Sequence, residues 1–255
     1  MALLKVTKLS KIFGGLKAVS DFNTIIAPGE LIGLIGPNGA GKTTVFNLLT
    51  GVYAPTEGRI EFDGAGLAGL KPYQITQRGI ARTFQNIRLF SELSVLDNVK
   101  IAYHFHVRYG LAEAVLRIGR YFREEDEIEQ KALTLLDIFQ LAHRRDEIAR
   151  NLPYGEQRRL EIARALAAQP RLLLLDEPAA GMNPQETQQL MSMIRWIRQE
   201  FNLTILLIEH DMSLVMGVCE RIYVLDYGSV IAQGTPAQIR SNPRVVEAYL
   251  GEEVH

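Results

Sequence analysis

The sequence predicts an α/β fold whose central feature is a buried parallel β-sheet. Three short apolar runs support this prediction, at residues 31–35, 172–175 and 203–208. The second run consists of leucines and is bounded by prolines, so it is too short for a buried helix. A strand that is apolar throughout is typical of a parallel sheet covered on both faces. A helical pattern at residues 184–200 separates the last two runs, which favours parallel strands joined by a crossover helix.

A glycine-rich stretch follows the first apolar run and precedes a helical pattern. It matches the Walker A pattern G-x-x-x-x-G-K-[ST] in the strand, loop and helix setting that this pattern requires. Glycines permit a backbone that turns successive N–H groups toward a phosphate, and the helix N-terminus adds a partial positive charge. We therefore expect a nucleotide-binding loop, in which Lys42 reaches the β- and γ-phosphates and Thr43 ligates Mg²⁺. Its candidate binding residues are Gly36, Pro37, Asn38, Gly39, Ala40, Gly41, Lys42, Thr43 and Thr44.

The first third of the chain predicts short strands. Residues 3–27 contain two antiparallel strands joined by a loop at residues 13–17, because their apolar residues come in short pieces that Gly14-Gly15 interrupts. A further strand at residues 58–62 ends at an Asp-Gly turn. The segment from Gly79 to Gln85 predicts another strand, which ends on a polar residue.

From Ser94 onward the pattern becomes helical. Ser94 is a plausible helix cap, and an aspartate lies in the first turn after it. Further helices are expected at about residues 110–118, 123–140, 158–169 and 184–200. A hairpin of two strands is expected at 222–225 and 229–233, and two short helices are expected at 236–251.

The composition narrows the classes of function. The chain has 255 residues, a formal net charge of −1 and a single cysteine, Cys219. This charge does not favour a nucleic-acid partner, and one cysteine forms neither an internal disulfide nor a thiolate cluster for zinc. The N-terminus lacks the regions of a signal peptide, and no apolar run approaches the ~20 residues of a membrane span. We therefore expect a soluble, intracellular protein.

Two acids follow the leucine run directly. The carboxyl ends of parallel strands form the ligand-binding edge of such a sheet, so Asp176 is expected to serve the Mg²⁺ of a bound nucleotide. Glu177 then becomes the candidate general base for water that attacks the γ-phosphate. The alternative is a carboxylate pair that only caps the strand. It is disfavoured, because adjacent acids at the end of a buried strand would then lack a cation. Gln85 and His210, each at the end of a predicted strand, are expected to sense or position the γ-phosphate.

These motifs resemble those of the ATP-binding subunits of ABC transporters, over nearly the whole chain. Gly36 to Thr43 match Walker A, Gln85 matches the Q-loop glutamine, Leu172 to Asp176 match Walker B and His210 matches the switch histidine. The resemblance implies that ATP and Mg²⁺ are the ligands, and that Thr43, Gln85 and Asp176 serve the metal. It also places Phe13 where the family has an aromatic residue, more often tyrosine, that stacks on adenine.

The resemblance also implies a domain organisation. We expect a P-loop NTPase fold forming a single ABC ATP-binding domain, with an antiparallel β-subdomain. Its RecA-like core is expected at about residues 1–91 and 158–235, with an inserted α-helical subdomain at about 92–157 and a helical tail at about 236–255.

Two motifs depart from the family pattern. The signature, normally Leu-Ser-Gly-Gly-Gln, is replaced by a stretch without the serine hydroxyl: Leu152, Pro153, Tyr154, Gly155, Glu156 and, next along the chain, Gln157. The D-loop, which usually ends in aspartate, reads Gly181-Met182-Asn183. Similar replacements occur in the G-type ATPase subunit of the branched-chain amino-acid importers, and the whole chain fits that subfamily.

The resemblance implies a motor subunit that lies peripherally on the cytoplasmic face of the cell membrane. Its expected partners are a second ABC ATPase subunit, two membrane permeases and, indirectly, a periplasmic or extracellular binding protein, without nucleic acid. A heterodimer is favoured over a homodimer, because a partner with an intact signature would complete the site built on Lys42, Asp176 and Glu177.

Four alternatives to this function stay open. Urea and short-amide importers contain close relatives of this subunit, and the ATPase that extracts lipopolysaccharide is similar but keeps the serine signature. A soluble ABC ATPase acting on ribosomes or DNA is disfavoured by the single cassette and the near-neutral charge. A kinase or GTPase with the same glycine loop is disfavoured because no guanine-specificity motif is present and His210 has no role there.

Overall fold

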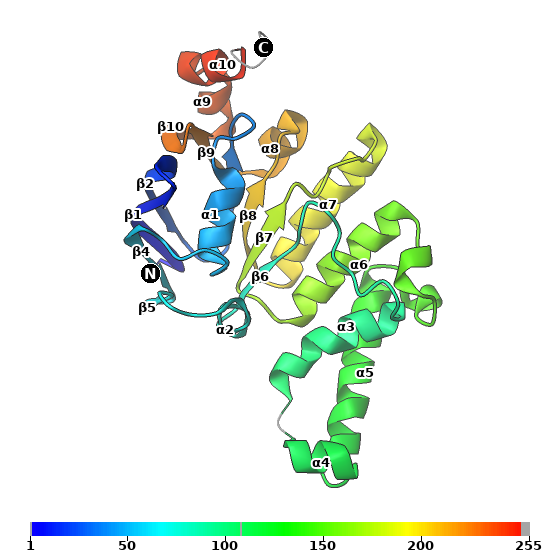
Figure 1. Ribbon diagram of the computed structural model, residues 1–255. Coiled ribbons are helices and arrows are strands. Elements are labelled where there is room, and N and C mark those ends of the chain that lie inside the picture. The colour runs from blue at the N-terminus through cyan, green and yellow to red at the C-terminus, as the bar shows by residue number, and fades with distance from the viewer. Residues whose placement is uncertain (1, 108, 251–255) are drawn as a thin grey trace. The chain divides into compact units, whose positions relative to one another are not determined.

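The structure is a computed structural model that describes residues 2–107 and 109–250 (Figure 1). Its Cα positions form two compact units: residues 1–85 with 171–255, called the core unit below, and residues 86–170, called the helical unit. Sequence reasoning expected the inserted helical segment at about 92–157. The compact unit is longer at both ends, and its C-terminal extension contains the helix that begins within the signature, which packs inside this unit.

A six-stranded sheet forms the centre of the core unit, in the order β10-β9-β3-β8-β7-β6. Its strands pair in parallel except for the hairpin of β9 with β10. All five residues of each of β3, β7 and β8 are buried, as the apolar runs predicted. The α/β fold class is therefore confirmed. The strands are β3 (Leu31–Ile35), β6 (Ile80–Arg82), β7 (Leu172–Asp176), β8 (Thr204–Ile208), β9 (Arg221–Asp226) and β10 (Ser229–Gly234).

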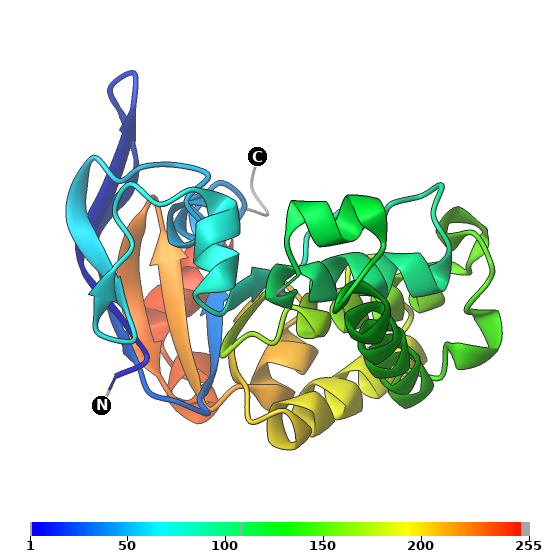
Figure 2. The same cartoon turned by 90° about the horizontal axis from the view of Figure 1, so that it is seen from below.

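A second, antiparallel sheet has the order β2-β1-β4-β5. It consists of β1 (Leu4–Phe13), β2 (Leu16–Ile26), β4 (Glu57–Phe62) and β5 (Ala65–Gly66). The register pairs Leu4 with Ile26 and Phe13 with Leu16, so the loop predicted at residues 13–17 is a tighter hairpin turn. In Figure 2 this sheet, in dark blue and cyan, lies beside the orange strands of the parallel sheet.

Helix α1 (Lys42–Leu49) joins the two sheets into one apolar interior. Its residues Val45, Phe46 and Leu49 are fully buried in a cluster that draws side chains from both sheets. The opposite face of the parallel sheet meets α8 (Met212–Val218), since a Cβ on Gly33 would lie 3.1 Å from the Cys219 Sγ next to that helix. This packing fixes the first turn of α1 against the end of β3, where the glycine loop lies.

The remaining helices of the core unit are α2 (Pro72–Gln77), α7 (Pro184–Glu200), α9 (Pro236–Arg240) and α10 (Pro243–Leu250). Helix α7 has the predicted bounds, and its Asn183 side chain caps the N–H groups of Gln185 and Glu186. Helices α2 and α8 were not predicted. The two predicted helices of the tail are present to Leu250, and the expected residues 251–255 lie outside the described part.

The helical unit contains α3 (Val95–Tyr103), α4 (Leu111–Leu116), α5 (Tyr121–Ile138) and α6 (Tyr154–Ala167). Ser94 caps α3 as predicted, because its hydroxyl accepts a hydrogen bond from Asp97 N at 3.0 Å. Helix α6 begins four residues before the predicted start and packs against α3 and α5. Among residues 2–107 and 109–250, no helix has the length and apolar character needed to span a bilayer.

Candidate functional site

The glycine loop between β3 and α1 packs so closely against its neighbours that two of its positions accept only glycine. A Cβ on Gly36 would lie 2.0 Å from Leu225 O, and one on Gly41 would lie 2.4 Å from Ala18 O. Both residues also have positive φ, +148° and +102°. The loop is thus pressed between β9 and the start of β2, which fixes the direction of its backbone N–H groups.

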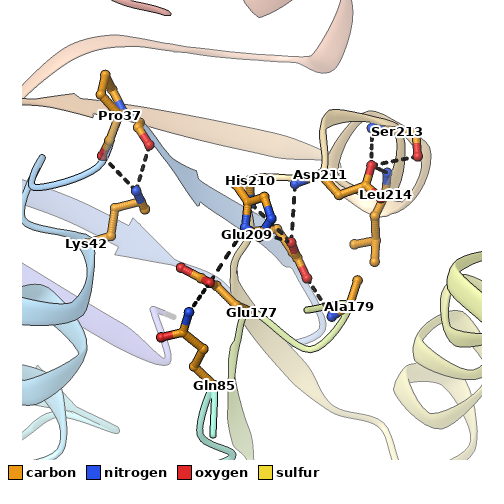
Figure 3. Close-up of polar contacts among 11 residues, drawn as sticks. Pro37, Lys42, Gln85, Glu177, Ala179, Glu209, His210, Asp211, Ser213 and Leu214 are labelled. Atoms are coloured by element: carbon orange, nitrogen blue, oxygen red, sulfur yellow. Dashed lines mark hydrogen bonds and ion pairs between the residues drawn. The ribbon is translucent and has the colours of Figure 1, made fainter. Parts of the chain in front are cut away.

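Lys42, the first residue of α1, is 7% exposed. Its ammonium donates to Gly36 O at 2.6 Å and to Pro37 O at 2.8 Å (Figure 3). Both acceptors belong to the loop itself. The side chain is therefore held over the loop by its own carbonyls, at a place where a phosphate would compete for the same charge.

Two hollows meet the glycine loop, and they share Asn38, Gly39, Ala40 and Tyr227. The smaller, about 330 Å³, also contains Lys42, Thr43 and Glu177. The larger, about 720 Å³, is bordered by α10 and the β9–β10 turn and contains none of these three. The groups with phosphate chemistry line the smaller hollow, and volume alone does not identify a ligand site.

Asp176 ends β7 and is 4% exposed. Its carboxylate Oδ2 accepts a hydrogen bond from Arg82 Nη2 at 2.5 Å, and Arg82 Nη1 donates to Asn47 Oδ1 at 2.7 Å. The guanidinium also lies 5.4 Å and 5.0 Å from the ring centroids of Phe46 and Phe84. Arg82 therefore neutralises Asp176 and orients it from the neighbouring strand β6.

Glu177 turns out of the strand with φ +46°, the left-handed region that non-glycine residues seldom adopt. Its carboxylate Oε2 accepts from Gln85 Nε2 at 2.6 Å and lies 3.6 Å from His210 Nδ1 (Figure 3). Glu177 is partly exposed at 17%, and His210 is exposed at 62%. The structure thus brings together the three residues that were predicted to surround the γ-phosphate.

His210 lies between two acids with different environments. Glu209 before it is fully buried, and this burial raises the pKa of its carboxyl above the ordinary value. Asp211 after it caps α8: its Oδ1 accepts from Ser213 N at 2.8 Å and Leu214 N at 3.2 Å. Burial alone would raise the pKa of Asp211, but these bonds and the Ser213 hydroxyl hold it below its usual value.

Phe13 lies at the end of β1, outside the smaller hollow, and is 39% exposed. Its ring meets Tyr53 edge to face at a centroid distance of 5.1 Å, and Lys11 Nζ lies 5.0 Å from the Phe13 centroid. The adjacent residues Leu16 to Ala18 do line the hollow. Phe13 therefore belongs to the hairpin that borders the site.

The altered signature forms the start of α6 in the helical unit. Leu152 is buried, Pro153 is the N-cap, and Tyr154 to Gln157 make up the first turn. Gln157 Nε2 donates to Leu152 O at 2.8 Å, and Arg158 Nη2 donates to the Tyr154 hydroxyl at 3.2 Å. The sequence predicted these residues before the helix, but Pro153 is its N-cap and the helix begins at the next residue, because a proline is tolerated at a helix N-terminus, where its missing N–H needs no partner.

Sequence reasoning missed two residues of this site, Arg82 and Glu209. An arginine at the end of a short apolar strand, three positions before a predicted ligand-binding glutamine, is a usable signal for Arg82, because a buried arginine must find an anion. Glu209 has no signal of its own in the sequence beyond its place directly after the apolar run at residues 203–208. Glu209 is buried against the loop that follows β7, and the sequence around β8 does not show that this loop lies there.

A glycine loop joins β3 to α1, its lysine lies over the loop, and an acid ends β7 in the same parallel sheet. These features define a P-loop nucleotide-binding protein. The family model "ABC transporter" matches residues 19–180, and the model "Branched-chain amino acid ATP-binding cassette transporter" matches residues 229–255. The chain therefore belongs to the ABC transporter family, and it is one of that family's ATPases.

Three further comparisons agree with this assignment. The chain is 50% identical to the high-affinity branched-chain amino acid transport ATP-binding protein LivG of Escherichia coli strain K12, over 98% of each chain. It is 36% identical to the lipopolysaccharide export system ATP-binding protein LptB of Haemophilus influenzae, over 99% of each. The solved ADP conformation of MJ1267, an ATP-binding cassette of an ABC transporter, matches with a TM-score of 0.85 and 30% identity, over 98% of this chain and 99% of that one.

Proposed function

We propose that this chain hydrolyses ATP to drive an importer for branched-chain amino acids. The observation that carries the proposal is the 50% identity to LivG over 98% of both chains, supported by the match of residues 229–255 to the branched-chain family model. The lower identity to LptB, 36%, makes lipopolysaccharide export the weaker candidate. The chain would act on the cytoplasmic face of the membrane, with two permeases and an external binding protein.

ATP would bind with its phosphates in the smaller hollow. The backbone N–H groups of the glycine loop and the N-terminus of α1 supply fixed positive potential there. The Lys42 ammonium would exchange its two carbonyl acceptors, Gly36 O and Pro37 O, for phosphate oxygens.

The donor set around the hollow fits Mg²⁺. Thr43 lines this hollow, and Asp176 ends β7, which lies two strands from β3 in the sheet. Mg²⁺ takes hydroxyl and carboxylate oxygens as ligands alongside phosphate oxygens. Thr43, Asp176 and Gln85 would hold the ion, and the ion would neutralise charge on the β- and γ-phosphates.

Glu177 would act as the general base. Its carboxylate accepts the proton as water attacks the γ-phosphorus, and the bond to the oxygen bridging the β- and γ-phosphorus atoms breaks, which leaves ADP and inorganic phosphate. Gln85 and His210 both lie within 3.6 Å of the same oxygen, Oε2, so they would fix its direction and leave Oε1 for the water. On this proposal Phe13 stacks against the adenine at the edge of the site.

The altered signature supports pairing with a different ATPase. Two copies of this chain would offer each other a Pro-Tyr stretch without the serine hydroxyl of the family signature. A partner with an intact signature would instead complete the site that carries Lys42, Asp176 and Glu177. The site on this chain would then be the faster of the two, and this chain alone would hydrolyse ATP slowly.

Uptake by cells that lack this chain tests the proposed substrate. We expect the deletion strain to lose high-affinity uptake of radiolabelled leucine, isoleucine and valine while its uptake of urea is unchanged. The wild-type chain should restore uptake, and the Glu177→Gln chain, expressed at the same level, should not. Normal leucine uptake together with lost urea or amide uptake would assign the chain to that other class of importer.

A further inference from the structure

Glu209 is an ionisable side chain at the site to which the mechanism above assigns no role. It follows β8 and is fully buried, with no exposed side-chain surface. A buried carboxylate is costly unless hydrogen bonds compensate for the loss of water. Its position between the end of a central strand and His210 therefore requires a reason.

The Glu209 carboxylate bonds to the main chain of two different loops. Oε1 accepts from Ala179 N at 2.7 Å, in the loop that follows β7. Oε2 accepts from His210 N at 3.1 Å and from Asp211 N at 3.3 Å, in the loop that follows β8 (Figure 3). One side chain thus ties together the segments that carry Glu177 and His210.

The bond to Ala179 lies two residues beyond the strained backbone of Glu177. Residues with positive φ persist only where the surroundings hold them. Glu177 N donates to Ile208 O at 2.9 Å, and Ala179 N donates to Glu209, so hydrogen bonds hold the chain at the strained residue itself and just beyond it. Loss of the second bond would free this turn to relax.

Only a carboxylate satisfies both loops at once. It offers two acceptor oxygens and no donor when ionised, and all three facing groups are N–H donors. A glutamine of the same shape must turn its NH₂ group toward either Ala179 N or the pair His210 N and Asp211 N. One loop would then face a donor instead of an acceptor.

We propose that Glu209 is a positioning residue of the ATPase site, which holds the Glu177 carboxylate and the His210 imidazole in a fixed relation by bonding the main chain of both loops. This inference rests on the proposed role of Glu177 as general base. Glu209 would touch neither the nucleotide nor the attacking water. It acts through the geometry of its two neighbours.

The test is a double-mutant cycle in the full-length chain, which is assembled with its partner ATPase and permeases for the measurement of kcat. We compare wild type, Glu209→Gln, Glu177→Gln and the double variant by the affinity for a fluorescent ATP analogue and by kcat at saturating ATP. We expect Glu209→Gln to change nucleotide affinity by less than about twofold and to lower kcat by about tenfold or more, as for a residue that acts only on the chemical step. The double variant should be no slower than Glu177→Gln, because both changes remove the same function.

Glu30→Gln is the matched control. Glu30 also accepts a main-chain N–H, from Ala27 at 2.7 Å, but it precedes β3 at the other end of the strand from the glycine loop. This variant should keep wild-type kcat. If Glu209→Gln does not fold, as judged by its unfolding midpoint, Glu209→Asp replaces it in the same cycle, with a smaller loss expected because the charge stays.

The outcomes separate this inference from the proposed function. Wild-type kcat in the Glu209 variant, or losses that add fully in the double variant, would overturn the positioning role while Glu177→Gln stayed slow. A Glu177→Gln chain with wild-type kcat would instead overturn the role of Glu177 as general base, and with it the inference that depends on it.

Discussion

Arg82 donates a hydrogen bond from Nη2 to Asp176 Oδ2 at 2.5 Å, and their side chains are only 7% and 5% exposed. The pair joins β6 to β7 at the end of the sheet where the nucleotide would bind. Asp176 thus has a fixed cation beside it before any metal arrives. The hydrogen bond from Arg82 orients the Asp176 carboxylate in the absence of any ligand.

Replacement of Arg82 should therefore destabilise the core unit strongly. Arg82→Met leaves the Asp176 carboxylate buried without its cation, and we expect a loss of about 3 kcal/mol in unfolding free energy. Arg82→Met with Asp176→Asn should recover part of this loss, since no charge stays buried. Urea unfolding of the wild type and of the two variants gives both values. Equal stability of wild type and Arg82→Met would mean that the ion pair contributes nothing.

Lys42→Ala should weaken nucleotide binding. It removes a charged donor that would serve the phosphates, worth about 1.5–3 kcal/mol, or an increase in Kd of about 10- to 100-fold. Titration with a fluorescent ATP analogue measures the change. Lys5→Ala, an exposed lysine on β1, is the control and should bind as wild type does. An unchanged Kd in Lys42→Ala would contradict the phosphate role.

Phe13→Ala should weaken ATP binding modestly, and Phe13→Tyr should not. Loss of one stacking ring is worth about 1 kcal/mol, or about fivefold in Kd. The control is Tyr73→Ala, which removes an exposed aromatic ring from α2. If Phe13→Ala bound ATP as tightly as wild type, the adenine would have to lie elsewhere, for example against Tyr53.

Cys219 should be unreactive in the folded protein. Burial raises the pKa of its thiol to about 12, with smaller contributions from Glu220 and Glu209, so the reactive thiolate is scarce at pH 8. Alkylation with iodoacetamide should be slow in buffer and fast in urea. The comparison is Tyr227→Cys in a Cys219→Ala chain, because that position is 89% exposed and should react at once. Rapid labelling of native Cys219 would show that α8 opens readily.

The sequence predicted those parts of the site that depend on local spacing. The loop motif predicted the positions of Gly36 and Gly41, and the apolar runs predicted the buried strands. The pairing of Arg82 with Asp176 was not visible, because the two residues are 94 positions apart and meet only through the order of the strands. Helix α8 was not predicted because it is short and contains Gly217, and glycine is a poor helix former. The structure explains this glycine, because a Cβ there would lie 2.1 Å from Met191 Cε of α7.

In the proposed mechanism, the ATP bound by this chain and hydrolysed through Glu177 drives more of the transport than the ATP bound by the partner ATPase. The most direct test places Glu177→Gln in this chain, or the equivalent change in the partner ATPase, in a transporter reconstituted with its permeases. We expect the change in this chain to abolish nearly all leucine transport and ATP hydrolysis, while the change in the partner leaves a substantial part of both. Equal losses, or a larger loss from the partner's variant, would contradict the larger contribution of the site on this chain.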